Sequence, residues 1–458
     1  MSLIKSPGGK VNLDFNKEFI SIFSDKIKVS DHKFINQTLK DLHPSDVANL
    51  IENLSADTRE KLIEIEEFNI DPEIFVEIND SIQSEVLQLL SIESIAKIIK
   101  RLESDNAIAI LENLETDKKN SVLDKLPPKD RFLLEEGLSY PEDSAARIMQ
   151  REFTAVPSDW SVGQTIDYLR ESKDLPGEFL EIFIVDIDFK PIGTVPASRV
   201  LRTSRESKMS QIMREMPVLI PVNMDKEEVG LTFDDYNLVS AGVVNKNNKL
   251  VGMITADDIV TVVKEEAEED VLRLAGVGDE EITDSVIVKT KRRFNWLLLN
   301  LFTALLATWV ISKFGASIEQ MVALAFLMPI VASMGGNAGM QTLAVTIRAI
   351  ATKELYKGNF NRIVGKEFLI GILNGIIFAI ITAVIVQLWF NELKLSILIA
   401  ISMVLNMIVA GIFGIMVPVT LKKINIDPAL ASSVFVTTIT DVIGFLSFLG
   451  LGSLFFLN

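Results

Sequence analysis

Five long apolar runs occupy the last third of the chain, and they limit most strictly what the chain can fold into. The runs cover about residues 294–313, 320–347, 367–390, 395–421 and 429–457 of a 458-residue sequence. Each is close to or above the ~20 residues that a helix needs to cross a bilayer. We therefore expect an all-α transmembrane domain of five helices over residues 289–458, with the lipid membrane as a partner.

Lysine and arginine are spread unevenly around these runs. Basic residues precede the first run, separate the second from the third, and separate the fourth from the fifth: Lys289, Lys291, Arg292, Arg293, Arg348, Lys353, Lys357, Arg362, Lys366, Lys422 and Lys423. The other two loops contain only Lys313, Glu319, Glu392 and Lys394 as charged residues. The positive-inside rule then predicts a cytoplasmic N-terminus and an external C-terminus.

One acidic residue, Asp441, lies well inside the fifth apolar run. A carboxylate in hydrocarbon costs roughly 3 kcal/mol or more, so Asp441 should face protein or water rather than lipid. Thr437, Thr440 and Gly444 are three or four residues away and should share its helix face. An ion or proton path is one interpretation, and a buried Asp that joins neighbouring helices is the other.

The second and fourth runs also contain polar and small residues. Pro329 is followed by Gly335-Gly336-Asn337-Ala338-Gly339, and the fourth run contains Asn406. Irregular backbone at membrane depth survives only against protein or a water-filled cavity, which predicts pore-lining roles for Gly336 and Asn337. A close glycine-mediated helix crossing explains the same pattern. Asn406 either lines the path or bonds a neighbouring helix.

Composition restricts the metal chemistry. The chain has no cysteine, two histidines and a net charge of −17. Soft sites built from Cys or His clusters are excluded, so any bound metal must be held by oxygen ligands, as Mg²⁺ and Ca²⁺ are. The part before the membrane runs is strongly acidic, which argues against nucleic-acid binding.

The soluble part contains two internal repeats. Leu50-Ile51-Glu52-Asn53-Leu54 recurs as Ile110-Leu111-Glu112-Asn113-Leu114, which predicts an α-helical solenoid-like regulatory domain over residues 1–143. Residues 144–263 repeat a strand–turn–strand–helix pattern and look like a tandem pair of CBS (α+β) domains. Such pairs often bind adenine nucleotides such as ATP through a Thr/Ser-x-x-Asp step, which Thr255 and Asp258 match.

An acidic helix is expected to connect the CBS pair to the membrane over residues 264–288. Glu266, Glu269 and Asp270 are spaced to share one face of that helix, where like charges repel each other. A bound cation would relieve this repulsion. A solvated acidic face is the alternative interpretation of the same residues.

Taken in order, the solenoid, the CBS pair, the acidic helix and the five spans resemble the MgtE family of magnesium channels and transporters. The most specific strings are Gly335-Gly336-Asn337-x-Gly339-x-Gln341 and Asp427-Pro428-Ala429-Leu430…Thr440-Asp441-Val442. The resemblance implies a homodimer in the inner membrane of a prokaryote, with the ion path between the subunits. It implies that Asp441 binds hydrated Mg²⁺ and that the acidic helix acts as a plug.

The resemblance also implies regulatory Mg²⁺ sites. By position these would involve the acids of the plug and the second CBS copy, together with solenoid acids and an acid at the start of the fifth span: Asp258, Glu266, Glu269, Asp270, Glu73, Asp105 and Asp427. Two departures are visible. Asn237 replaces an acid that is usual in the family, and Ser433 stands where relatives can have Asn, on a face expected to line the pore.

The predicted function is therefore a Mg²⁺ channel or transporter gated by intracellular Mg²⁺, and not an enzyme. Two alternatives use Asp441 differently. It could be the titrating group of a proton-coupled carrier, or part of an intramembrane aspartyl enzyme. The enzyme would need a second carboxyl group to share a proton, and only Asp441 is expected within a span.

Overall fold

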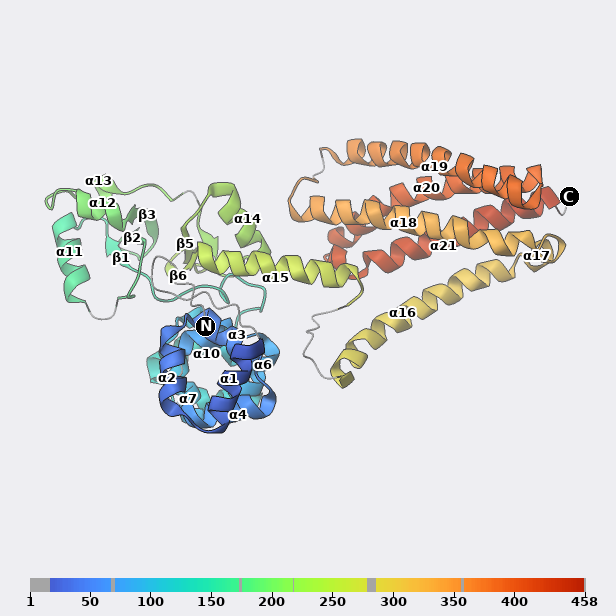
Figure 1. The fold of residues 1–458 in the computed structure, drawn as a ribbon. Coiled ribbons are helices and arrows are strands. Elements are labelled where there is room, and N and C mark those ends of the chain that lie inside the picture. The colour runs from blue at the N-terminus through green and yellow to red at the C-terminus, as the bar shows by residue number, and fades with distance from the viewer. Residues whose placement is uncertain are drawn as a thin grey trace. The chain divides into compact units, whose positions relative to one another are not determined.

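The computed structural model describes residues 17–66, 71–172, 175–216, 218–277, 286–355 and 358–456, without the side chains of 17, 66, 430 and 431. The chain divides into two units, Met1–Lys264 and Glu265–Asn458 (Figure 1). Helix α15 (Ala256–Leu274) begins in the first unit and ends in the second.

Short helices wind round a common axis at the start of the first unit (Figure 1). They are α1 (Lys17–Lys28), α2 (His32–Asp41), α3 (Pro44–Glu52), α4 (Ala56–Glu66), α5 (Pro72–Glu77), α6 (Asp80–Leu89), α7 (Ile92–Ile99), α8 (Ser104–Glu112), α9 (Thr116–Leu123) and α10 (Pro128–Leu138). Polar side chains start several of them: Asp31 Oδ1, for example, accepts from the Phe34 N–H at 3.2 Å. One apolar core that includes Phe23, Leu87 and Leu111 joins the helices. The expected helical N-terminal domain is confirmed.

Two small sheets with the same topology follow. The first contains β1 (Ala155–Pro157), β2 (Glu181–Val185) and β3 (Pro191–Pro196), and the second contains β4 (Ile220–Pro221), β5 (Ser240–Val244) and β6 (Leu250–Thr255). In each sheet the first two strands are parallel and the last two antiparallel. The register pairs Ile184 with Gly193 and Val243 with Gly252, and both sheets shift register directly afterwards. This shared irregularity supports the internal duplication, and the tandem CBS fold is confirmed.

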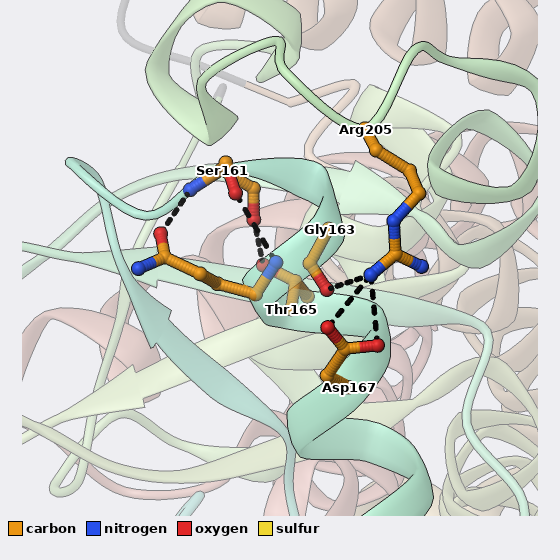
Figure 2. Close-up of polar contacts among 6 residues, drawn as sticks. Ser161, Gly163, Thr165, Asp167 and Arg205 are labelled. Carbon is orange, nitrogen blue, oxygen red and sulfur yellow. Dashed lines mark hydrogen bonds and ion pairs between the residues drawn. The ribbon is translucent and has the colours of Figure 1, made fainter.

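The remaining helices of this region are α11 (Val162–Glu171), α12 (Ala197–Arg202), α13 (Met209–Ile212) and α14 (Lys226–Tyr236). Figure 2 shows how α11 begins. Ser161 Oγ accepts from the Gln164 N–H at 3.1 Å, and the Ser161 N–H donates to Gln164 Oε1 at 2.8 Å, a reciprocal capping box. Arg205 donates to both carboxylate oxygens of Asp167, at 2.6 and 2.9 Å. This ion pair ties the segment after α12 to α11.

The second unit contains five helices, among the residues described, that are long and apolar enough to cross a membrane. They are α16 (Val286–Ser312), α18 (Ala323–Ala351), α19 (Phe360–Phe390), α20 (Leu393–Lys423) and α21 (Pro428–Phe456), and the short α17 (Gly315–Gln320) precedes α18. Helices α18, α20 and α21 all pack on one another, α19 packs on α20, and α16 packs on α21. The predicted five-helix domain is confirmed.

Glycines allow α20 to approach α18 and α19 closely. A Cβ on Gly371 would lie 2.9 Å from the Met407 carbonyl oxygen, and one on Gly414 would lie 2.7 Å from Thr342 Cβ. Small residues at such crossings let helix backbones approach, and van der Waals packing then stabilises the pair.

The connecting helix differs from its predicted range of 264–288. It starts eight residues earlier, at Ala256, directly after strand β6. Residues 278–285 of the predicted range lie outside the described residues, and residues 286–288 belong to α16. The acidic segment is thus the second half of a helix that begins within the second CBS copy.

Candidate functional site

Asp441 lies near the middle of α21, and its side chain is partly exposed. Ser433 and Thr437, eight and four residues earlier, are also partly exposed, so the three form a polar stripe along one helix face. No ion-pair partner for Asp441 exists among the described residues. The stripe agrees with the sequence-based expectation for Ser433 and Thr437.

Thr440 does not belong to this stripe. Its side chain is fully buried, and its hydroxyl donates to the Val436 carbonyl at 3.0 Å within α21. Its methyl group faces Gly339 of α18. The pore-lining prediction for Thr440 is wrong, because residue 440 is rotated about 100° from residue 441 and so faces the helix packing.

Helix α18 presents a second polar stripe. Ser333, Asn337 and Gln341 are four residues apart and all exposed, while Gly336 is partly exposed. None of the three side chains hydrogen-bonds to another described residue. Exposed amides and hydroxyls at membrane depth need water or another protein surface. The sequence singled out Asn337 and Gly336 for a polar path, and the structure adds Ser333 and Gln341 to the exposed polar residues of this helix.

Asn406 bonds a neighbouring helix, which is one of the two roles that its sequence position allowed. Its side chain is fully buried, and Nδ2 donates to the Val331 carbonyl of α18 at 2.8 Å. It lies between Gly335 of α18 and Gly444 of α21. The pore-lining prediction for Asn406 is therefore wrong: it joins three helices inside the chain.

Two adjacent glycines should respond very differently to alanine. A Cβ at Gly335 would lie 2.1 Å from Asn406 Nδ2, whereas a Cβ at Gly336 has its nearest neighbour, Thr440 Oγ1, at 3.9 Å. We expect Gly335→Ala to destabilise the purified protein by about 1–3 kcal/mol, as overpacked cores do. Gly336→Ala, the matched control, should be neutral or slightly stabilising. Thermal unfolding measures both, and equal stability of the two variants would contradict the described packing.

A second carboxyl group lies within a membrane helix. Glu367 was placed at the edge of the third apolar run, but α19 begins seven residues earlier, so Glu367 lies two turns inside it. Thr342 Oγ1 of α18 donates to Glu367 Oε2 at 3.1 Å. Glu367 directly follows Lys366, at the charged end of α19, so Asp441 remains the one acid well inside a span among the described residues. The hydrogen bond to Thr342 gives Glu367 a structural role between α18 and α19.

The second half of α15 lies against the first turn of α21. Arg273 forms ion pairs with both Glu269 and Asp427. Asp427 also accepts from the Ala429 N–H at 2.8 Å and so caps α21. Leu274 packs against the apolar cluster of Leu343, Ile347, Ala429 and Val436. Glu269 and Asp427 were predicted as metal-binding acids, but here each already contacts an internal cation.

Glu266 and Asp270 belong to the same acidic face of α15, but Arg273 does not form an ion pair with either of them. Burial, and then the negative charges of Asp427 and Glu266, raise the pKa of Asp270 above its ordinary value. Glu266 is partly exposed and makes further polar contacts. Negative charges thus surround Asp270 at this face, and Arg273 places a positive charge beside Glu269 and Asp427.

Helix α15 ends in a defined way. Gly276 has φ of +73°, which favours glycine, and the Val277 N–H donates to the Leu272 carbonyl while the Gly276 N–H donates to that of Arg273. This is a Schellman motif. A Cβ on Gly276 would collide with the indole ring of Trp296 in α16. The acidic helix is thus anchored at its end to the first membrane helix.

Acidic side chains also meet in the first unit. Asp105, in the first turn of α8, is only 8% exposed and lies close enough to Asp258 of α15 to share a hydrogen bond. Burial, and then the negative charge of Asp258, raise the pKa of Asp105 well above its ordinary value. Burial also raises the pKa of Asp258. The structure thus brings together two acids that are 153 positions apart.

Glu103 belongs to the same cluster and was missed from the sequence. Burial, followed by the charges of Asp258 and Glu152, raises its pKa. Gln150 Nε2 donates to Glu103 Oε2 at 3.0 Å and to Asp258 Oδ2 at 3.2 Å. Glu103 directly precedes α8, and no spacing signal connects it with residues 150–258. Glu73 is exposed and lies near enough to add to the field at Glu103.

Asp258 has two further contacts. Its Oδ2 accepts from the Thr255 hydroxyl at 2.6 Å and from the Thr255 N–H at 3.2 Å. The Thr-x-x-Asp step therefore starts α15, and the same carboxylate faces Glu103 and Asp105. A nucleotide ribose and a metal ion would compete for it.

The donor set fits a hard divalent cation. Asp105 Oδ1 is buried and has no hydrogen-bond partner, a costly state for a carboxylate oxygen. Among the described residues no group of three or more acidic or histidine side chains is arranged to hold a metal ion. Mg²⁺ commonly keeps several waters and binds through one or two carboxylates, so a pair such as Asp105 and Asp258 is sufficient.

The second unit has five membrane helices and a carboxylate, Asp441, that has no ion-pair partner among the described residues. It is joined to a helical domain and a CBS pair with acidic clusters, an arrangement typical of membrane transporters with a regulatory domain. Family models match three regions: "Divalent cation transporter" over residues 328–451, "MgtE intracellular N domain" over 42–143, and "CBS domain" over 209–265.

Curated relatives agree with these matches. The magnesium transporter MgtE of Bacillus subtilis is 31% identical over 69% of this chain and 71% of its own. Those of Enterococcus faecalis and Thermus thermophilus are 28% and 29% identical over 70% and 72% of this chain, and over 71% and 74% of their own. The chain belongs to the MgtE family.

One solved structure, the cytosolic domain of the Mg²⁺ channel MgtE in complex with ATP, aligns with 53% of this chain and 99% of its own at 22% identity and a TM-score of 0.49.

Proposed function

We propose that the chain is a magnesium transporter of the bacterial cell membrane that works as a homodimer, with the ion path between two membrane units. The exposed stripe of Ser333, Asn337 and Gln341 on α18, and that of Thr437 and Asp441 on α21, support this. A polar surface within a membrane must face water or protein, and a second copy would enclose both stripes.

Asp441 from each subunit would then bind the transported ion. Mg²⁺ gives up its waters reluctantly, so a path that carries it hydrated needs few direct ligands and benefits from fixed negative charge. Two carboxylates, with hydroxyl and amide oxygens around them, supply that charge and accept hydrogen bonds from the ion's waters.

The distribution of basic residues supports a cytoplasmic first unit. Arg348, Lys353, Arg362, Lys422 and Lys423 lie at the same ends of the helices as the junction of α15 with α21. The positive-inside rule assigns those ends to the cytoplasm. The acidic clusters would then sense intracellular Mg²⁺.

One observation gives the main support for gating by intracellular Mg²⁺. Asp105 is buried next to Asp258, and Asp105 Oδ1 has no hydrogen-bond partner. Carboxylates held this close repel each other until a cation binds between them. A ligand that binds one arrangement better than another shifts the protein toward it. Mg²⁺ held by Asp105 and Asp258, with Glu103 and Glu73 nearby, would stabilise the joined state of the solenoid and CBS domains.

The acidic half of α15 would connect the Mg²⁺-bound state of the first unit to closure of the ion path. Glu266 and Asp270 lie beside Asp427 at the start of α21, the helix that contains Asp441. Mg²⁺ at Glu266 and Asp270 would strengthen the contact that Arg273 already makes with Asp427. The helix would then act as a plug that holds the path closed.

ATP binding at the CBS pair is a further proposal, supported by the Thr255–Asp258 step. Of the two alternatives for Asp441, the aspartyl enzyme needs a proton-sharing partner, and Glu367, the other carboxyl group on a membrane helix, bonds Thr342 instead. A proton-coupled carrier would show flux that follows a pH gradient, whereas the proposed channel follows voltage and the Mg²⁺ gradient.

Limited proteolysis tests the regulatory site. Mg²⁺ should protect the first unit of the purified full-length protein, and KCl at matched ionic strength should not, because screening alone does not bridge carboxylates. In Asp105→Asn we expect the Mg²⁺ concentration at half protection to rise about ten-fold, a loss of about 1.4 kcal/mol. Asp57→Asn, on the exposed face of α4, is the control. An unchanged midpoint in Asp105→Asn would contradict this site.

A further inference from the structure

Four cationic side chains gather where α19 begins and α20 ends. They are Arg362, Lys366, Lys422 and Lys423. Helices α19 and α20 pack against each other and are joined by two residues, so the start of one lies beside the end of the other. Lys423 Nζ lies 6.0 Å from the centroid of the Phe360 ring, which confirms that the two ends meet.

These cations lack local counter-charges. All four side chains are exposed, and none has an ion-pair partner among the described residues. The nearest acid along α19 is Glu367, whose carboxylate accepts from Thr342 on α18. The cluster therefore carries uncompensated positive charge.

The position of the cations on their helices indicates what they face. Along α19, Arg362 and Lys366 continue at three- and four-residue steps into exposed apolar side chains: Leu369, Leu373, Ile377, Ile380, Val384 and Leu388, which are 54–79% exposed. Along α20, Ile397, Ile401, Leu405 and Met416 are 40–43% exposed, and Lys423 lies two turns after Met416 on the same helix face. The exposed apolar stripe of each helix thus ends in positive charge.

We propose that this cluster binds the phosphate headgroup of an anionic phospholipid whose acyl chains lie along the apolar stripes of α19 and α20. Lipid chains cover an exposed apolar stripe within the membrane, and the headgroup then lies at the level of the cations. An acidic segment of another protein would also match the positive charge of the cluster. It would not, however, cover the apolar stripes of α19 and α20 that adjoin the cluster. The proposal is independent of Mg²⁺ binding and of gating.

Each cation near an anionic lipid surface strengthens binding by about five-fold. The site should therefore prefer phosphatidylglycerol over phosphatidylcholine by at least about ten-fold. The two lipids have similar chains and differ in headgroup charge, so this comparison isolates the cations from the apolar stripes.

Native mass spectrometry of the full-length protein in detergent, with the two lipids added at equal concentration, measures this preference. In Lys422→Gln/Lys423→Gln, which lacks two of the cations, we expect the preference to fall by at least about ten-fold. Lys313→Gln/Lys394→Gln is the matched control, because it removes the same charge near the opposite ends of the spans and should keep the preference. Thermal unfolding in phosphatidylcholine checks that all variants fold, and Arg362→Gln/Lys366→Gln gives an independent second variant.

Three outcomes would overturn the proposal. The first is an equal lipid preference in the wild type and in both cluster variants. The second is an equal loss in the control, which would make total charge the determinant. The third is complete competition by millimolar inorganic phosphate, which would identify a soluble anion as the ligand. Retention of phosphatidylglycerol in the presence of phosphate, lost only in the cluster variants, would support it.

Discussion

Replacing Asp441 by Asn should reduce Mg²⁺ flux through the purified, reconstituted protein to about one hundredth or less. The amide keeps the shape of the side chain but removes the single intramembrane charge that has no partner among the described residues. Losing a charge-assisted interaction of about 3 kcal/mol corresponds to roughly a hundred-fold effect.

The control for this variant is Glu319→Gln, the same chemical change at an exposed residue of α17. Its flux should match the wild type. Thermal unfolding must show that Asp441→Asn is folded, which is expected because the carboxylate makes no hydrogen bond with another described residue. Normal flux in folded Asp441→Asn would exclude Asp441 as the ion-binding residue.

Neutralising the acidic face of α15 should leave the path open when Mg²⁺ is high. In Glu266→Gln/Glu269→Gln/Asp270→Asn, these carboxylates no longer hold Mg²⁺ beside Asp427, and α15 contacts α21 through Arg273 and Leu274 without a bridging cation. We expect the Mg²⁺ concentration that halves the flux to rise by at least about ten-fold, within the usual range of allosteric coupling.

A matched triple change exists on α4. Asp57, Glu60 and Glu64 are exposed and lie on one helix face, so Asp57→Asn/Glu60→Gln/Glu64→Gln removes the same charge from the first unit. This control should close at the wild-type Mg²⁺ concentration. If the α15 variant also closes there, its acids are solvated surface and the plug role is wrong.

The parts of the fold that depend on local pattern could be predicted from the sequence. The five spans followed from run length and hydropathy, and the duplicated sheets followed from the repeat that includes Gly193 and Gly252. Polar groups are costly in lipid and must face water or protein instead. This predicted that Asn337 and Asp441 would not be packed among apolar side chains, and the structure shows Asn337 exposed and Asp441 partly exposed. Each of these signals is contained in one stretch of chain.

Contacts between distant stretches could not be predicted in the same way. The ion pair of Arg273 with Asp427 joins residues 154 positions apart, and the bond from Asn406 to the Val331 carbonyl spans 75. Glu103 joins Asp258 only because α8 and α15 are brought together. Thr440 was misassigned because a shared helix face was inferred from spacing, although one residue of rotation separates the partly exposed face of α21 from its packed face.

If intracellular Mg²⁺ closes a path that carries Mg²⁺, flux through the wild-type protein must depend on the Mg²⁺ concentration at its cytoplasmic side. Oriented proteoliposomes should be given Mg²⁺ on the side of the acidic helix at constant ionic strength and a fixed electrochemical driving force. Flux should fall steeply as Mg²⁺ on that side rises and should be unchanged by equivalent K⁺. Flux that is independent of Mg²⁺ on that side, or equally reduced by K⁺, would contradict closure of the path by intracellular Mg²⁺.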